Sequence, residues 1–266
     1  MRRLTAAVLL LTLFVFVAVG QSLGQTPQSS GKRPVFEVAT IKRNTSLEGN
    51  GRVSNEPGGR FEAVNAPVFW LVASAYSESL GGLRPEQIVG APPWLESEHY
   101  DIVAKAEDPA DMSSFEKTRR LLRSLLEDRF QLRAHREQRE MPVYALVHAR
   151  SDDALGPRFK QSTPDCFQES AKCGFPGGPF GRIKAGAISM DLLTQLLSSA
   201  SGRIVVDRTG LKGGFEIDLE YSPDQTASDK PSIFTAVQEQ LGLKLESTKA
   251  PVDVLVIDHV ERPMPD

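Results

Sequence analysis

The sequence predicts an α+β fold made of two tandem duplicated β-α-β-α-β-β modules, with helices packed on small mixed sheets. Three observations predict it: ordered similarity between the two halves of the chain, amphipathic helical stretches, and the apolar–polar alternation typical of strands. Hydrophobic residues make up 40% of the chain, including 13 phenylalanines. This content suits a globular core and argues against disorder.

The two halves resemble each other in blocks that keep their order. "GRFEAVNAPVFWLVASA" from Gly59 matches "GRIKAGAISMDLLTQLL" from Gly181, at an offset of 122 residues. Two further matches follow: "WLESEHYDIVAKAE" (94–107) with "GLKGGFEIDLEY" (210–221), and "RFQLRAHREQREMPVYALV" (129–147) with "QLGLKLESTKAPVDVLV" (240–256). The offset falls gradually to 109 residues, so the ordered set indicates an internal duplication.

The second helix of each copy has clear start or stop signals. In the first copy Ser113 can cap a helix with Glu116 three residues later, ahead of an apolar stripe of Leu121, Leu122, Leu125 and Leu126. Its counterpart is predicted over 231–242, with Pro231 in the first turn and Gly242 at the end.

The strands are predicted from alternation. "VFEVATIK" (35–42) reads as a first strand, and "NTSLEGNGRVSNEPGG" (44–59) as a turn-rich loop. "PVYALVHA" (142–149) and "VDVLVIDHV" (252–260) are predicted as exposed sheet edges that accept a partner strand by β-augmentation.

The N-terminus predicts a secretory signal peptide over residues 1–20. Arg2 and Arg3 precede an uncharged apolar run, and small residues follow, so that cleavage is expected after Gly20 or Gly24. A retained membrane anchor is the alternative, because the apolar run is almost long enough to span a bilayer. The sequence thus predicts an exported protein, periplasmic or secreted, with no stable membrane span after cleavage.

The net charge of −3 becomes about −5 when the signal segment is removed, and this mild acidity disfavours a nucleic-acid partner. The two cysteines, Cys166 and Cys173, are predicted to form a disulfide that closes a short loop in the exported chain. Their six-residue spacing and the absence of a nearby histidine disfavour a redox or zinc pair.

The chain divides by composition and repeat into five parts. Residues 1–20 are the signal peptide, 21–33 a flexible lead-in, 34–150 the first repeat module, 151–180 a disulfide-containing connector and 181–266 the second repeat module.

Six ordered stretches carry a resemblance over roughly residues 34–264. They are "FEVATIK", "GGRFEAVNAPVFWLVASAY", "GAPPWLESEHYDIVAKAE", "LLRSLLEDRFQLRAHRE", "VVDRTGLKGGFEIDLEY" and "SIFTAVQEQLGLKLE…PVDVLVIDHVERP". Together they resemble a large paralogous family of exported proteins of unknown function from soil Acidobacteria of the Solibacter type. The resemblance implies export and no particular catalytic activity. Each half also resembles the short periplasmic N-terminal module of secretins and TonB-dependent receptors, as a likeness of fold.

No catalytic motif occurs in the context that its chemistry needs. G-x-S-x-G occurs from Gly20 to Gly24, but it falls at the signal cleavage region and not between a strand and a helix. Ser114 and Lys117 spell S-x-x-K, but the partner motifs of serine acyl-transfer enzymes do not follow. The four histidines show no metal-binding spacing, and no cofactor is predicted. Carboxylates near Asp101 or Asp207 leave an extracytoplasmic hydrolase open as an alternative.

Possible partner or ligand contacts are the aromatic residues Trp70, Tyr76 and Trp94, together with Asp207 and Arg208. The "DRTG" turn at 207–210 is interpreted as a structural corner, because a strand follows where a phosphate-binding loop would open a helix. The leading hypothesis is an exported, non-catalytic binding or interaction module whose partner is an envelope or extracellular protein or ligand. The ectodomain of a membrane-anchored sensor is the third alternative.

Overall fold

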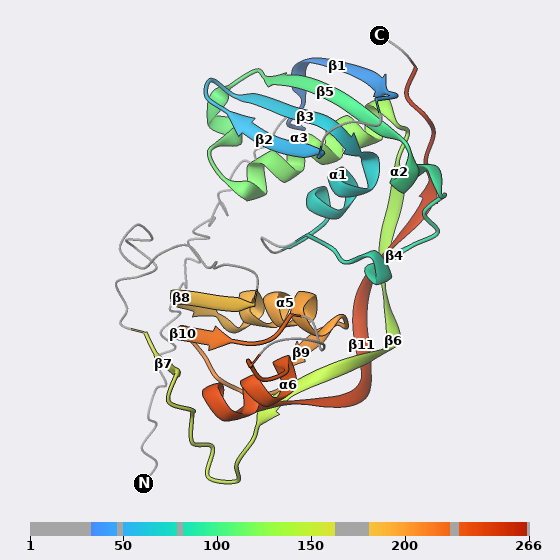
Figure 1. Ribbon diagram of the computed structural model, residues 1–266. Coiled ribbons are helices and arrows are strands. Elements are labelled where there is room, and N and C mark those ends of the chain that lie inside the picture. Colours follow the sequence, from blue (N-terminus) through green and yellow to red (C-terminus); the bar gives the residue numbers. More distant parts are fainter. Residues whose placement is uncertain (1–32, 47–49, 79–81, 163–180, 224–228, 265–266) are drawn as a thin grey trace, which may run out of the picture. The chain divides into compact units, whose positions relative to one another are not determined.

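Figure 1 shows the computed structural model, which describes residues 33–46, 50–78, 82–162, 181–223 and 229–264. The chain from Pro34 onward forms one compact unit. Three small sheets with helices packed against them confirm the predicted α+β class.

The first sheet is antiparallel and has the strand order β1-β5-β3-β2. Helices α1 and α3 pack against it, and the core between them includes Phe61, Leu71, Ile102 and Leu126. The elements are β1 (Phe36–Asn44), β2 (Arg52–Glu56), β3 (Arg60–Pro67), α1 (Val68–Ala75), α2 (Trp94–Ser97), β5 (His99–Ala106), η2 (Pro109–Met112) and α3 (Phe115–Arg129).

The second sheet has the order β7-β10-β8 and is also antiparallel. It forms a separate core with helix α5, α6 and the π-helical turn η4, centred on Ile188, Leu193 and Phe215. The elements are β7 (Phe159–Gln161), β8 (Arg182–Ser189), α5 (Met190–Ser201), β10 (Gly214–Glu220), α6 (Ile233–Ala236) and η4 (Val237–Leu241).

The third sheet joins the two halves of the chain. Its order is β4-β11-β6-β9, with the long strands β6 (Arg133–His148) and β11 (Leu243–His259) antiparallel at its centre. Short η1 (Pro85–Gln87) leads into β4 (Ile88–Val89), which pairs in parallel with β11. β9 (Val205–Asp207) pairs in parallel with β6.

Each core contains residues from the long strand of the other half. Leu255 and Ile257 at the end of β11 belong to the first core, and Leu146 near the end of β6 belongs to the second. The two halves are therefore interlocked through the third sheet.

The strand registers of the two halves correspond residue by residue. β3 pairs with β5 through Ala63↔Ile102 and then, after a bulge, Ala66↔Tyr100. β8 pairs with β10 through Ala185↔Ile217 and then, after a bulge at the same place, Ile188↔Phe215. The internal duplication inferred from the sequence stays a prediction; these registers are those that it would produce.

Two predictions about strands are wrong. Residues 142–149 and 252–260 are not exposed edges, because β6 and β11 pair with each other and each is flanked by a short parallel strand. Residues 44–59 are not only a loop, because β2 lies within them. β7 likewise lies within the range that we expected to be a connector.

Several predictions concern residues outside the described part of the chain. They are the signal peptide, the lead-in except Arg33, and the disulfide between Cys166 and Cys173. Within the described residues, no helix is long and apolar enough to cross a membrane.

Candidate functional site

A tight hairpin turn positions strand β2 beside β3. Pro57, Gly58 and Gly59 connect it to β3, and the two glycines have φ values of 79° and 76°. A side chain disfavours such positive φ values, whereas glycine adopts them readily. The turn sets a register that runs from Arg52↔Val64 to Glu56↔Arg60 and leaves β2 at the edge of its sheet.

The outer edge of β2 carries unpaired backbone groups. The backbone N–H of Ala106 donates to the Gly59 carbonyl at 2.8 Å, so Gly59 and every second residue after it face β5. The alternate residues of β3 then bond to Arg52, Ser54 and Glu56. Val53 and Asn55 consequently direct their N–H and C=O groups away from the sheet. No other strand among the described residues pairs with this edge.

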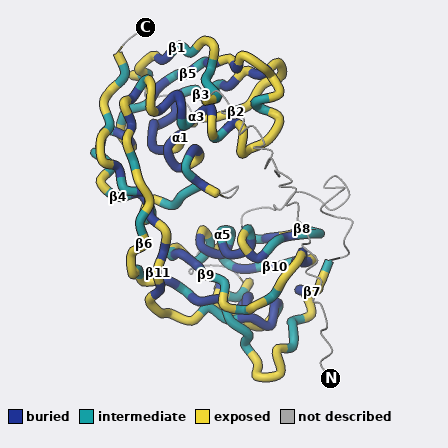
Figure 2. Tube along the Cα trace, turned by 180° about the vertical axis from the view of Figure 1, so that it is seen from behind, coloured by how far each residue is buried: buried dark blue, intermediate teal, exposed yellow. Residues whose placement is uncertain are grey.

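A groove of about 460 Å³ runs between this edge and helices α1 and α3. Exposed apolar side chains line it: Val53 is 43% exposed, Trp70 45% and Phe115 59%. Figure 2 shows the exposed residues that dominate β2. The other lining residues are Gly51, Arg52, Ser54, Asn55, Phe61, Ser74, Thr118, Arg119 and Leu122. We call this set the β2 groove.

The two helices present their exposed aromatic residues for different reasons. Helix α1 buries Val68, Leu71, Val72 and Ala75, which leaves Trp70 on the opposite side. Phe115 is the first residue of α3, where the N-cap Ser114 accepts a hydrogen bond from the Lys117 N–H at 3.3 Å. The expected cap, Ser113, is thus displaced by one residue.

Gly51 lets Trp70 lie close to the backbone. A Cβ atom at position 51 would lie 2.8 Å from the indole ring and 2.5 Å from the Asn65 carbonyl oxygen. Atoms at these distances overlap, so only glycine permits this arrangement. The indole is thereby held against the start of the hairpin.

The charged residues that line the β2 groove are both positive. Arg52 forms an ion pair with Glu62 at 2.9 Å on the outer face of the sheet. Burial lowers the pKa of Arg119 from its usual value, and the nearby charge of Arg123 lowers it further. The groove therefore combines apolar surface, a free strand edge and the positive charge of Arg119, whereas the charge of Arg52 is paired on the opposite face of the sheet.

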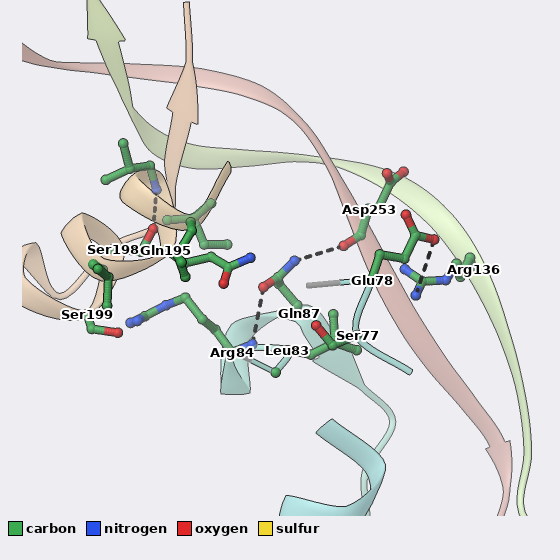
Figure 3. A pocket seen from close by; sticks show the side chains of 15 residues that line it. Ser77, Glu78, Leu83, Arg84, Gln87, Arg136, Gln195, Ser198, Ser199 and Asp253 are labelled. Atoms are coloured by element: carbon green, nitrogen blue, oxygen red, sulfur yellow. Dashed lines mark hydrogen bonds and ion pairs between the residues drawn. The ribbon is translucent and has the colours of Figure 1, made fainter. Parts of the chain in front are cut away.

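A second hollow of about 280 Å³ lies between residues of the two halves (Figure 3). Several of its polar side chains already bind within the protein. Gln87 accepts a hydrogen bond from the Arg84 N–H at 3.1 Å and donates to the Asp253 carbonyl at 3.2 Å. Ser198 donates to Thr194 at 2.6 Å. These bonds indicate a structural junction.

The structure separates the aromatic residues singled out in the sequence. Trp70 lies in the β2 groove, whereas the Tyr76 ring lies under Arg123, with 5.1 Å between the guanidinium and the ring centroid. Trp94 lies under Arg262 at 5.0 Å. Trp70 is the one of the three that lines the groove.

Asp207 and Arg208 belong to a turn. The Asp207 carboxylate accepts hydrogen bonds from the N–H and the hydroxyl of Thr209, at 2.9 and 2.7 Å. The Arg208 N–H donates to the Leu146 carbonyl at 2.9 Å. Both contacts support the interpretation of a structural corner.

Asp101 serves a similar purpose in the first sheet. Its carboxylate accepts hydrogen bonds from the Asn65 N–H at 2.7 Å and from the Asn44 amide at 2.9 and 3.1 Å. Asp101 lies on β5 and Asp207 on β9, in different sheets. Among the described residues, no group of three or more metal-ligating side chains could hold an ion.

The C-terminal segment is fastened by a charged cluster. Arg262 donates to both oxygens of Glu98, with distances of 2.8 to 3.1 Å. These bonds hold the pKa of Glu98 below its usual value, assisted by the Tyr100 hydroxyl. Burial, together with the bond to Glu98, raises the pKa of Tyr100 to about 12.

Sequence reasoning missed Val53, Phe115 and Arg119 as site residues. The signal was available in "RVSNEPGGRFEAV", where two alternating stretches flank a Pro-Gly-Gly turn. Abundant Gly, Asn and Ser made the range 44–59 resemble a loop. Phe115 and Arg119 belong to the predicted helix, and they lie beside β2 only in the folded chain.

The fold and the groove define an α+β protein with an open edge strand. The family described as a protein of unknown function (DUF3738) matches residues 70–260, and the chain belongs to this family. The match begins at Trp70, so β1 to β3 precede it. Neither the curated proteins nor the solved structures include a match. The resemblance to the Acidobacterial family and to the secretin and TonB-receptor modules stays a prediction.

Proposed function

We propose that this chain is an exported, non-catalytic binding module that contacts its partner along β2. One observation carries the proposal: the free edge of β2 borders a groove lined by Val53, Trp70 and Phe115, all partly exposed. An edge strand with unpaired backbone groups is a template for pairing with another chain. The proposed binding edge is therefore β2, and not β6 or β11 as the sequence predicted.

A strand added beside β2 would make two kinds of contact at once. Its backbone would pair with the outward groups of Val53 and Asn55. These two residues share the face of Ala63 and Phe61, their cross-strand partners, which is the face toward the core. Inward side chains of the added strand would therefore cover Trp70 and Phe115. Backbone pairing supplies affinity, and the apolar cover supplies specificity.

The alternative of a hydrolase receives less support. Asp101 holds Asn65 and Asn44, and Asp207 holds Thr209, so each carboxylate accepts hydrogen bonds within the fold. A general base needs a lone pair, and a general acid a proton, directed at the substrate. The sensor alternative differs from the proposal only in a retained N-terminal anchor, and the same groove would serve it. The proposed partner is an envelope or extracellular protein, and no cofactor takes part.

Site-specific photo-crosslinking tests the proposal in cells that export the full chain. A photoreactive phenylalanine analogue replaces Val53 in one variant and Val38 in another. Val38 is the matched control, because it is 59% exposed on β1, at the opposite edge of the same sheet. We expect protein adducts from position 53 and none from position 38. Equal adducts from both positions, or none from position 53, would refute binding along β2.

A further inference from the structure

We infer that the partner of β2 is a second copy of this chain, paired antiparallel through β2 about a two-fold axis at Ser54. The inference rests on the proposed function, because it uses the same edge. It adds the identity of the partner and the register. Isologous pairing of this kind makes one continuous sheet from the first sheets of both copies.

The backbone geometry of β2 is self-complementary. Val53 and Asn55 carry the outward backbone groups and lie symmetrically on either side of Ser54. With Ser54 opposite Ser54, Val53 of each copy faces Asn55 of the other. Antiparallel neighbours at such positions exchange two backbone hydrogen bonds. All five residues of β2 then lie opposite a residue of β2 in the other copy.

The charges of β2 select this register. Arg52 of each copy lies opposite Glu56 of the other, and both side chains project from the outer face of the sheet, opposite the groove. Glu62 already binds Arg52 on that face at 2.9 Å, and Arg60 lies directly opposite Glu56 within each copy. The new pairs therefore extend a row of alternating charge across the sheet. A register displaced by two residues loses both pairs, and opposite charges facing each other favour the pairing.

Ser54 provides an independent indication. Its hydroxyl is buried and has no hydrogen-bond partner among the described residues. Buried polar groups without a partner are uncommon in folded proteins and call for an explanation. At the two-fold axis Ser54 lies opposite its own equivalent. Because the hydroxyl is covered in a single chain, it must change rotamer to bond to the partner serine, and paired serines across antiparallel strands form such hydrogen bonds.

The apolar surface also favours a second copy. Val53 lies on the groove side of β2, so Val53 of one copy lies opposite Asn55 of the other, beside the apolar groove of that copy. Because the pair is symmetric, each copy contributes the same apolar residues and covers the groove of the other. A five-residue strand offers few backbone bonds, so this cover is needed for a stable pair.

Charge exchange tests the inference with the full, exported chain by sedimentation equilibrium. We expect the wild type to be dimeric. Arg52→Glu alone places like charges opposite Glu56, and Glu56→Arg alone places them opposite Arg52. Each variant should raise the dimer dissociation constant at least about tenfold. An equimolar mixture of the two variants restores both opposite pairs, so it should recover the dimer.

A cysteine at the axis gives a second, independent readout. Residues opposite each other at a non-hydrogen-bonded antiparallel pair have Cα atoms about 4.5 Å apart, within the range of a disulfide. Ser54→Cys should therefore yield an oxidised dimer on a non-reducing gel. Val38→Cys, on the opposite edge strand, is the control and should run as a monomer on the same gel.

A monomeric wild type, or a dimer that neither variant weakens and that Ser54→Cys does not crosslink, would overturn the inference. Failure of the inference is distinguishable from failure of the proposed function. If photo-crosslinking from position 53 captures a different protein, binding along β2 stands and the second copy does not.

Discussion

Asp101 accepts a hydrogen bond of 2.7 Å from the backbone N–H of Asn65, at the bulge where β3 turns toward helix α1. Asn65 has a φ of 48°, a left-handed conformation that a residue with a side chain adopts at some cost. Its own side chain binds the His99 ring at 2.8 Å. The carboxylate of Asp101 thus stabilises the bend that positions Trp70.

Replacing Asp101 by alanine should lower the free energy of unfolding by about 2 kcal/mol, because bonds to a charged acceptor from Asn65 and Asn44 are lost. Urea denaturation measures this loss. Glu216 occupies the matching position on β10 and only forms an exposed ion pair with Lys160. Glu216→Ala should cost less than about 1 kcal/mol. Equal losses in the two variants would show that the bulge does not depend on Asp101.

Gly51→Ala should displace Trp70, because the new methyl group would overlap the indole ring. We expect a loss of about 1–3 kcal/mol in unfolding free energy and a shift in tryptophan emission. Gly58→Ala is the control: it has a φ of 79° but no atom within 4 Å of the added methyl group. It should cost about 1 kcal/mol through backbone strain alone and leave the emission unchanged.

Glu98 should make the free energy of unfolding depend on pH in the acidic range. Its pKa in the folded protein is lowered from 4.5, first by the bonds from Arg262 and then by the Tyr100 hydroxyl and the charge of Arg43. A lowered folded-state pKa contributes stability above the unfolded value, and this contribution is lost as the pH falls through the folded value. The difference in unfolding free energy between wild type and Glu98→Gln should thus be largest above pH 4.5 and shrink below it.

Arg262→Gln supplies the control for this prediction, since it removes the main cause of the lowered pKa of Glu98. The double variant should show little further loss beyond either single variant. A difference between wild type and Glu98→Gln that stays constant from pH 7 to pH 3 would contradict the assignment.

The N-terminus of the exported chain should begin at Gln21 or Gln25, because small residues precede both positions. Mass spectrometry of the mature protein measures the cleavage site. Detection of a mature chain that still carries Met1 would contradict cleavage and favour the membrane-anchored alternative.

The sequence was a good guide wherever local patterns decide structure. The stripe of leucines from Leu121 to Leu126 predicts α3, and alternation predicts β5 and β10. It failed where pairing between distant segments decides. The strands β6 and β11 look like edges in isolation, yet each is the other's neighbour over almost its full length. The groove was missed for the same reason, because β2, α1 and α3 meet only after folding.

The interlocked halves lead to a last prediction. Fragments 34–150 and 151–266 should each fail to unfold cooperatively alone, because the first core needs Leu255 and Ile257 from β11 and the second needs Leu146 from β6. The loss of one such buried side chain costs about 2–5 kcal/mol, against a total stability of roughly 5–15 kcal/mol for a typical domain. Mixing the fragments should restore β6–β11 pairing and a cooperative transition, measured by circular dichroism. Fragment 34–150 unfolding cooperatively by itself would mean that the exchanged strands are dispensable and that the halves are independent domains.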